Sequence, residues 1–340
     1  MMRYLLLFIL FPFIAVGQKF ELVELTAGAA SSIRGMSVVS DQIAWVSGSA
    51  GSVGKTLDGG KTWSWVKPAG YEQLDFRDIE AFDGKRAVIV NAGSPAFILT
   101  TRDGGKTWKE VYQNRDSAIF LDGMAFWNQR EGLIFGDPIN HKMQLLKTKD
   151  GGGSWSDVSG SLHLPLAEGE AGFAASGSTI RAMKGGKVWI ATGGKVSNIY
   201  VSNNFGSSWS VYPCPIWQGE SSTGVFSMDF LDTKRGIVVG GNYVKDKENT
   251  NNILLTYDGG KTWKKPVNPV KGYRSSVLYI NPKLVLATGT SGTDISEDGG
   301  LHWSSLSPLG FNVLGKSKNS RLILLANGKG QVYQLRRKKS

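Results

Sequence analysis

Short apolar runs alternate with polar, glycine-rich turns along the whole chain, and the runs have the length of β-strands. No stretch of useful length repeats its apolar residues with the period of a helix. The pattern therefore predicts an all-β protein made of many short strands. The recurring apolar runs are residues 43–46, 87–90, 133–135, 188–191, 237–239 and 284–287, and further runs enter the turns at 96–100, 144–148 and 253–256.

An eight-residue motif follows these runs six times. It reads small polar residue, any residue, Asp, any residue, Gly, any residue, Thr or Ser, then Trp, which is the signature of an Asp box. Asp accepts hydrogen bonds within a turn, Gly supplies positive φ, and Trp covers apolar surface. Each box is therefore predicted to be a structural β-hairpin and not a catalytic site. The boxes are residues 56–63 (Asp58, Trp63), 101–108 (Asp103, Trp108), 148–155 (Asp150, Trp155), 202–209 (Asn204, Trp209), 256–263 (Asp258, Trp263) and 296–303 (Asp298, Trp303).

The spacing of the boxes predicts a seven-bladed β-propeller of four-stranded antiparallel blades. Successive box tryptophans lie 45, 47, 54, 54 and 40 residues apart, which suits one blade per repeat. After the last box, residues 312–316, 322–325 and 331–335 provide only three more strands. Residues 20–25 can supply the missing strand and close the ring. A six-bladed ring with a loose C-terminal unit is the alternative.

The N-terminus has the features of a signal peptide. Arg3 precedes an apolar run at residues 5–14, and Ala15, Val16 and Gly17 offer small residues for cleavage. The sequence thus predicts a signal peptide at 1–17, and export to the periplasm or the exterior. A single propeller domain is expected at 18–340, of which 336–340 form a solvated basic tail. Nothing after the signal peptide has the length and apolarity of a membrane span.

Charge and cysteine content limit the choice of partner. The chain has a formal net charge of +11, but export argues against nucleic acid and favours a protein or glycan partner in the cell envelope. Cys214 is the single cysteine, which excludes an intrachain disulfide, and it is expected to be a half-buried small hydrophobe. We expect a monomer.

Several segments resemble the photosystem II stability and assembly factor family, whose members are seven-bladed. The resemblance is carried by residues 32–39, 44–49, 74–82 and 169–176 together with the first box. It covers nearly all of the mature chain and is best over the first 110 residues. It implies an exported, chaperone-like module that binds a protein partner.

No cofactor or metal site is predicted. Gly54, Lys55 and Thr56 end like a phosphate loop, but Ser49 stands where the first glycine is needed and a turn replaces the helix. No G-x-G-x-x-G motif joins a strand to a helix. The three histidines, His141, His163 and His302, form no close ligand pair.

Alignment of the blades places charged residues at the start of the innermost strands. Arg34, Arg77, Asp122 and Arg274 then occupy one repeat position, which predicts that they line the mouth of the central channel. Asp78 and Glu170 are expected nearby. The six residues can form a polar recognition site, since arginine binds carboxylates in a fixed fork. Alternatively, they form salt bridges between blades.

Other features are expected near this face. The connections 136–142 and 241–252 should be long loops, and the second is rich in charged residues and Asn. Trp217 and Tyr71 are candidate aromatic anchors for a partner, although each can equally pack inward.

The sequence leaves two functions open. The first is a non-catalytic binding or scaffold module, an assembly-factor-like chaperone that recognises a protein through the charged axial face. The alternative is a glycan-acting hydrolase of the sialidase or glucanase kind, with a carboxylate pair among Asp78, Asp122, Asp137 and Glu170. Arginines near the axis resemble a sialidase carboxylate clamp, but sialidase rings have six blades.

Overall fold

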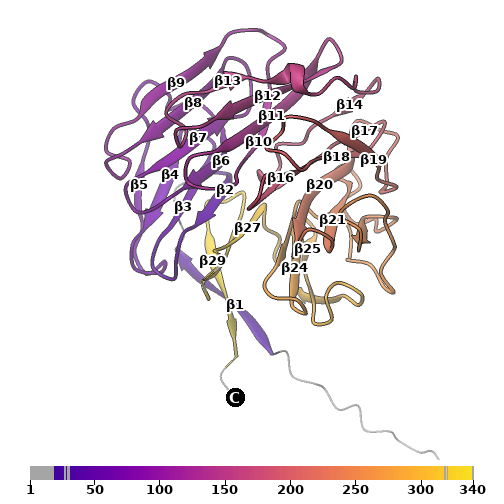
Figure 1. Cartoon of the computed structure of the whole chain (residues 1–340). Helices are drawn as coiled ribbons and strands as arrows, with labels where there is room; N and C mark the ends of the chain where they lie inside the picture. The colour runs from indigo at the N-terminus through magenta and orange to yellow at the C-terminus, as the bar shows by residue number, and fades with distance from the viewer. Residues whose placement is uncertain (1–18, 27, 29–30, 318, 320, 339–340) are drawn as a thin grey trace, which may run out of the picture.

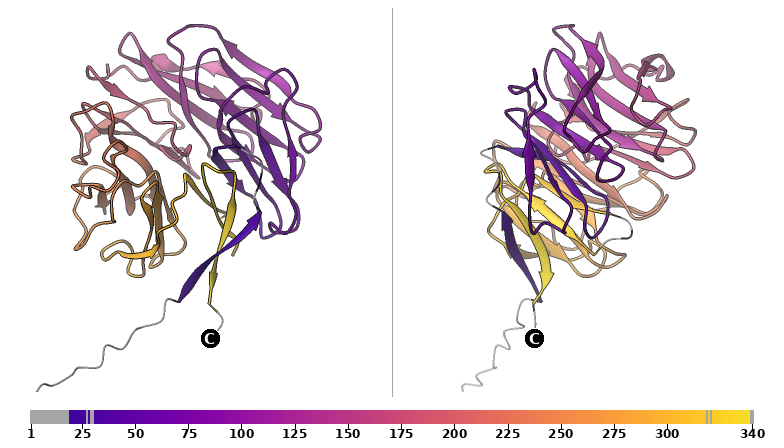
Figure 2. Two further views of the ribbon diagram at one scale, coloured as in Figure 1. Left: turned by 180° about the vertical axis from the view of Figure 1, so that it is seen from behind. Right: turned by 90° about the vertical axis from the view of Figure 1, so that its left-hand side faces the viewer.

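The computed structural model describes residues 19–26, 28, 31–317, 319 and 321–338. The predicted signal peptide and the last two residues of the basic tail lie outside the described residues. Seven antiparallel sheets are arranged around a central axis (Figures 1 and 2). This confirms the predicted seven-bladed propeller. In the described residues, no helix has the length and apolar character needed to span a membrane.

The first four blades follow the chain from their inner to their outer strand. A 3₁₀-helix, η1 (Ser159–Ser161), joins the third blade to the fourth. The strands are β2 (Ile33–Val38), β3 (Ala44–Gly48), β4 (Val53–Thr56) and β5 (Ser64–Val66) in blade 1; β6 (Phe76–Ala81), β7 (Ala87–Asn91), β8 (Ala96–Thr101) and β9 (Lys109–Asn114) in blade 2; β10 (Leu121–Phe126), β11 (Gly132–Ile139), β12 (Lys142–Thr148) and β13 (Ser156–Asp157) in blade 3; and β15 (Ile180–Met183), β16 (Lys187–Ala191), β18 (Asn198–Ser202) and β19 (Ser210–Pro213) in blade 4.

The remaining blades show two departures from this plan. Blade 5 has a single bridge, Leu255 to Lys264, in place of its outer strand, and the short pair β14 (Glu170–Ala171) and β17 (Gly193–Gly194) extends its inner edge. Blade 7 takes its outer strand from the N-terminus. The strands are β20 (Thr223–Phe230), β21 (Gly236–Asn242) and β22 (Ile253–Thr256) in blade 5; β23 (Ser276–Tyr279), β24 (Val285–Gly289), β25 (Gly292–Ser296) and β26 (Ser304–Ser307) in blade 6; and β27 (Val313–Lys316), β28 (Ile323–Ala326), β29 (Val332–Arg337) and β1 (Phe20–Thr26) in blade 7.

The two ends of the chain close the ring. Strand β1 pairs antiparallel with β29, with Leu22 opposite Leu335, and the two strands lie side by side in Figure 1. Phe20 is buried in the cluster between blades 6 and 7. The predicted closure is therefore confirmed, and the six-bladed alternative is wrong. Pairing removes the unpaired edge that β29 would otherwise present to other chains.

Each Asp box forms the turn between the third and fourth strands of its blade, or, in blade 5, between β22 and the bridge residue Lys264. In the first box, Oδ1 of Asp58 accepts the N–H of Thr62 at 2.9 Å and Oδ2 accepts its hydroxyl at 2.6 Å. Thr56 Oγ1 accepts the N–H of Gly60 at 2.9 Å. The hydrogen bonds from Thr62 lower the pKa of Asp58 to about 2. The carboxylate is thus committed to its own turn, as predicted.

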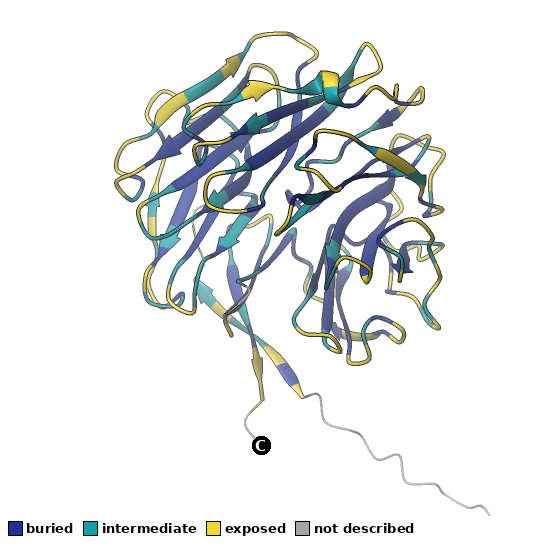
Figure 3. Cartoon of the chain, viewed as in Figure 1, coloured by how far each residue is buried: buried dark blue, intermediate teal, exposed yellow. Residues whose placement is uncertain are grey.

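The core consists of clusters between neighbouring blades, and each box tryptophan packs into one of them. Trp108 of blade 2 contacts the cluster that Trp45 and Ile89 form between blades 1 and 2. Trp209 and Trp303 have the same place in the clusters before blades 4 and 6. The middle strands are buried on both faces because every blade lies between two others (Figure 3). The repeat thus supplies both the turn and the wedge that holds adjacent blades together.

Candidate functional site

A cavity of about 490 Å³ lies at one mouth of the central channel. Its walls come from the first strands of several blades, from connections beside them, and from a segment that precedes the first strand of blade 4. Charged, aromatic and small polar side chains face it from different blades. They include Arg34, Arg77, Asp122, Asp137, Phe226, Tyr243, Tyr273, Ser275 and Asn312.

A β-bulge directs the key side chains into this cavity. The pairing register of the inner strand skips one residue in blades 1, 2, 3 and 5, and the skipped residues are Arg34, Arg77, Asp122 and Phe226. A bulge re-aims a side chain because the extra residue leaves the ladder. The repeat alignment therefore correctly placed Arg34, Arg77 and Asp122 together. It missed Phe226, which the same alignment reveals once an apolar residue is accepted at this position.

The chain itself crosses the axis through residues 171–175, which line the cavity. Arg34 Nη1 donates to the carbonyl of Ala175 at 3.3 Å, and Arg77 Nη1 donates to that of Ala174 at 3.4 Å. Arg77 Nε also donates to Asp75 at 2.8 Å. Both arginines are half-buried and hold this segment through long hydrogen bonds. Their guanidinium groups thus retain capacity for another acceptor.

Burial controls the titration of the cavity residues. It lowers the pKa of Arg34, and the neighbouring Arg77 lowers it further. Burial raises the pKa of Asp122 well above its usual range, and Asp137 raises it further, while Arg77 acts in the opposite direction. Burial also raises the pKa of Asp137, whose Oδ1 accepts the N–H of Gly172 at 2.8 Å. The cavity thus places two arginines beside two carboxyl groups that resist ionisation.

Four aromatic rings form a cluster at this cavity. Phe173 stacks on Phe226 with ring centroids 3.9 Å apart, and Tyr273 meets Phe226 edge to face at 4.9 Å. Tyr243 packs against the edge of the same ring and keeps 49% of its surface exposed. Two signals for this cluster were present in the sequence: the alignment of Phe226 and the predicted position of the 241–252 connection, which contains Tyr243.

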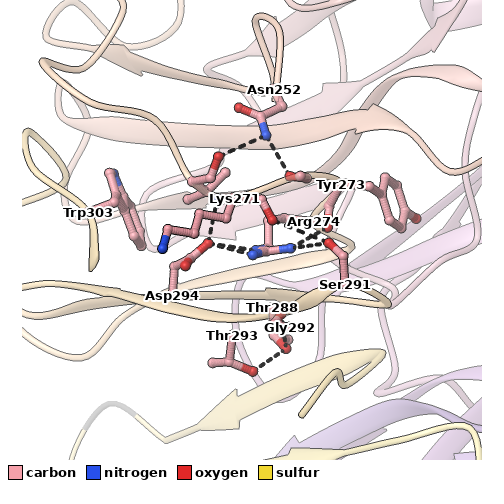
Figure 4. Close-up of polar contacts among 12 residues, drawn as sticks. Asn252, Lys271, Tyr273, Arg274, Thr288, Ser291, Gly292, Thr293, Asp294 and Trp303 are labelled. Atoms are coloured by element: carbon pink, nitrogen blue, oxygen red, sulfur yellow. Dashed lines mark hydrogen bonds and ion pairs between the residues drawn. The ribbon is translucent and has the colours of Figure 1, made fainter. Parts of the chain in front are cut away.

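The prediction for Arg274 is wrong. Its side chain is 1% exposed, does not line the cavity, and forms an ion pair with Asp294, at 2.6 Å between Nη2 and Oδ2 (Figure 4). Nη1 donates to the carbonyl of Tyr273 and to Ser291 Oγ. Ser275, one residue later, lines the cavity instead. The sequence alignment of blade 6 was out of register by one position.

Glu170 and Asp78 do not line this cavity, although their neighbours Ala171 and Arg77 do. Glu170 is 2% exposed, and its carboxylate accepts hydrogen bonds from the Ala167 N–H and from Thr192, Asn198 and Tyr200. It is a buried anchor for the segment that follows it.

Asp78 follows Arg77 in β6 but does not line the cavity that Arg77 lines. It lines a second cavity, of about 510 Å³, at the opposite end of the channel. Burial raises the pKa of Asp78 to about 8, although the N–H groups of Met124 and Ile79 donate to it.

Of the two connections predicted to be long loops near this face, one is a tight turn and the other reaches the cavity. Residues 136–142 are no long loop, because β11 and β12 continue to a tight hairpin turn at Asn140 and His141. The 241–252 connection does reach the candidate site, since Tyr243 lines the cavity.

The expected anchors lie outside this cavity. Trp217 is half-buried, and its backbone N–H donates to the carbonyl of Asn251. Tyr71 packs against Phe97 and donates to Glu110. Cys214 is fully buried rather than half-buried, and burial raises the pKa of its thiol to about 12. Among the described residues, no group of three or more His, Cys, Asp or Glu side chains is placed to hold a metal ion.

Fold and site together define the class as a seven-bladed Asp-box propeller with an axial cavity. Residues 15–116 and 75–212 match the family described as photosynthesis system II assembly factor YCF48, and the chain belongs to that family. No protein of curated function matches the chain in sequence.

Solved structures resemble the chain over almost its whole length. The structure described as YCF48 bound to D1 peptide has 17% identity and a TM-score of 0.65, covering 93% of this chain and 94% of that one. YCF48 from Cyanidioschyzon merolae has 17% identity and a TM-score of 0.63, with coverages of 93% and 98%. Virginiamycin B lyase from Staphylococcus aureus has 14% identity and a TM-score of 0.66, with coverages of 93% and 99%. At these identities the likeness shows the fold alone.

Proposed function

We propose that this chain is an exported, non-catalytic binding module that recognises a segment of a protein partner in the cell envelope at its axial cavity. The observation that carries the proposal is the convergence of Arg34, Arg77 and Phe226 on one cavity through equivalent bulges. Repeated units that aim different side chains at one point build a specific site. The apolar run at residues 5–14 supports export.

The chemistry of the cavity suits a peptide segment. Arg34 and Arg77 already donate to backbone carbonyls, so they can donate to the carbonyls or carboxylates of a partner. The ring of Tyr243 offers an exposed aromatic contact. The structure titled YCF48 bound to D1 peptide supports peptide binding by a propeller of this family. An assembly-factor role, in which the module holds an unfinished partner, follows from the same likeness.

Site-specific cross-linking tests this proposal. A photoreactive p-benzoylphenylalanine replaces Tyr243 in the cavity wall or, as a matched control, Tyr257, which is also 49% exposed but does not line the cavity. We expect Tyr243 to cross-link one defined segment of an envelope protein and Tyr257 not to do so. The Arg34→Gln/Arg77→Gln double variant should reduce the cross-link by about tenfold or more, because two charge-assisted hydrogen bonds are lost. Equal cross-linking from both tyrosines contradicts the proposal.

A glycan-acting hydrolase is the second candidate. The observation that favours it is the pair Asp122 and Asp137, which line the same cavity and have raised pKa values. A carboxyl group with a raised pKa can act as a general acid. Glu170 and Asp78, the other two predicted carboxylates, do not line this cavity. Turnover of sialosides or β-glucans that is lost in Asp122→Asn and Asp137→Asn would favour this function over binding alone.

A further inference from the structure

Asp122 stands apart from the other charged residues of the cavity. It is 1% exposed, and neither carboxyl oxygen has a hydrogen-bond partner among the described residues. Arg77, the cation whose charge acts on it, directs its Nε to Asp75 instead. An unpaired buried carboxyl group is costly, so it needs either a proton or a counter-ion. The fold therefore buries the carboxyl group of Asp122 without giving it a hydrogen-bond donor from the described residues.

The surroundings of Asp122 form a small acidic subsite. Asp137 lies close enough for its charge to act on Asp122, and both line the axial cavity. Gly172 lies against both groups: its N–H donates to Asp137, and a Cβ atom at this position would collide with the Asp122 carboxyl. Glycine thus lets the axial segment cover Asp122 without a side chain. A ligand that reaches Asp122 has to shift the Gly172 peptide.

We infer that Asp122, with Asp137 beside it, binds the ammonium group of a lysine side chain of the bound partner. This rests on the proposed function and adds the chemistry of one contact. An ammonium group has three donors and no acceptor, which matches two carboxyl oxygens without partners. The adjacent rings of Phe173 and Phe226 cover the alkyl stem. The cavity then recognises a basic residue beside the acceptor groups to which Arg34 and Arg77 donate.

Two small probes test this subsite without a known partner. Nα-acetyl-L-lysine N-methylamide carries the ammonium group, and Nα-acetyl-L-norleucine N-methylamide has nearly the same shape without it. Each is titrated into residues 18–340 with ¹³C-carboxyl-labelled aspartate, and the Asp122 resonance is assigned by its absence in Asp122→Asn. We expect the lysine probe to move this resonance and to bind about tenfold more tightly than the norleucine probe.

Two variants complete the test. Asp122→Asn should lower the affinity for the lysine probe about tenfold, whereas Glu297→Gln, which removes an exposed carboxylate that does not line the cavity, should leave it unchanged. Equal affinity for the two probes, or equal affinity of wild type and Asp122→Asn for lysine, overturns the inference. The comparison of the lysine and norleucine probes on the wild-type protein tests the inference even if Asp122→Asn fails to fold.

The same measurements separate this inference from the proposed function. A lysine probe that binds at Asp122 while Tyr243 cross-links no partner segment supports the subsite and contradicts the proposed function. A partner segment that cross-links at Tyr243 while the lysine probe leaves Asp122 unchanged supports the proposed function and overturns the subsite.

Discussion

The buried ion pair of blade 6 makes a stringent test of how this propeller is held together. Arg274 donates to Asp294 Oδ2 through Nη2 at 2.6 Å and through Nε at 3.0 Å, and both side chains are 1% exposed. The same guanidinium donates to the Tyr273 carbonyl at 2.7 Å and to Ser291 at 2.8 Å. Figure 4 shows these groups converging between neighbouring strands and loops. One substitution, Arg274→Met, removes all four hydrogen bonds.

The expected loss of unfolding free energy in Arg274→Met follows from the partners that Asp294 keeps. In Arg274→Met, Asp294 keeps one donor, the N–H of Lys271 at 2.8 Å, and is otherwise a buried charge without a counter-ion. Removing one partner of a buried ion pair costs about 3–5 kcal/mol of unfolding free energy. The exposed pair Arg86–Asp83 has a similar separation, 2.7 Å, but its side chains are 43% and 41% exposed. Arg86→Met should therefore cost less than about 1 kcal/mol.

Urea unfolding followed by tryptophan fluorescence measures both variants. The double variant Arg274→Met/Asp294→Asn should recover part of the loss, since it no longer buries an unpaired charge. If Arg274→Met costs no more than Arg86→Met, the buried pair is not structural and our reassignment of Arg274 fails. Cross-linking at Tyr243 should persist in folded Arg274→Met because Arg274 does not line the cavity.

Three further predictions concern the boxes, the cavity and the closure. Asp103→Ala should lower the urea midpoint more than Asp103→Asn, because Asn204 shows that an amide can make these turn bonds; equal effects would contradict this. The raised pKa of Asp122 means that wild type loses stability as pH rises from the unfolded-state value of about 4 toward the folded one. Asp122→Asn should therefore match wild type near pH 4 and exceed it near pH 8, and a constant difference in unfolding free energy would refute this. Deleting residues 18–26 should uncover the β29 edge and produce oligomers in size-exclusion chromatography with light scattering, whereas a chain that begins at residue 18 should not.

The repeat made most of the fold predictable from sequence. An Asp box encodes its turn locally, through a carboxylate that bonds to residues four positions away, so no distant contact is needed to recognise it. The same periodicity assigned Arg34, Arg77 and Asp122 to one ring. Closure was predictable because the last blade lacks one strand and residues 20–25 supply it.

Departures from the repeat could not be predicted in the same way. In blade 6 the residue equivalent to Arg34 is Ser275, so Arg274 falls one position earlier and is buried, while Ser275 lines the cavity. The segment before β15 leaves the blade and crosses the channel, held by long-range contacts that include Ser176 to Ser275. Such contacts depend on the assembled ring, which local patterns do not describe.

The pairing of β1 with β29 has a consequence for how the ring is completed. The strand made first has to wait, unpaired, until the strand made last is available, and the closing contact joins residues more than 300 positions apart, such as Phe20 and Arg337. Until β1 pairs, the edge of β29 is unpaired, and the β1 strand of another copy can pair with it equally well. Exchange of this strand between two chains is thus the dimeric error that the architecture makes most accessible.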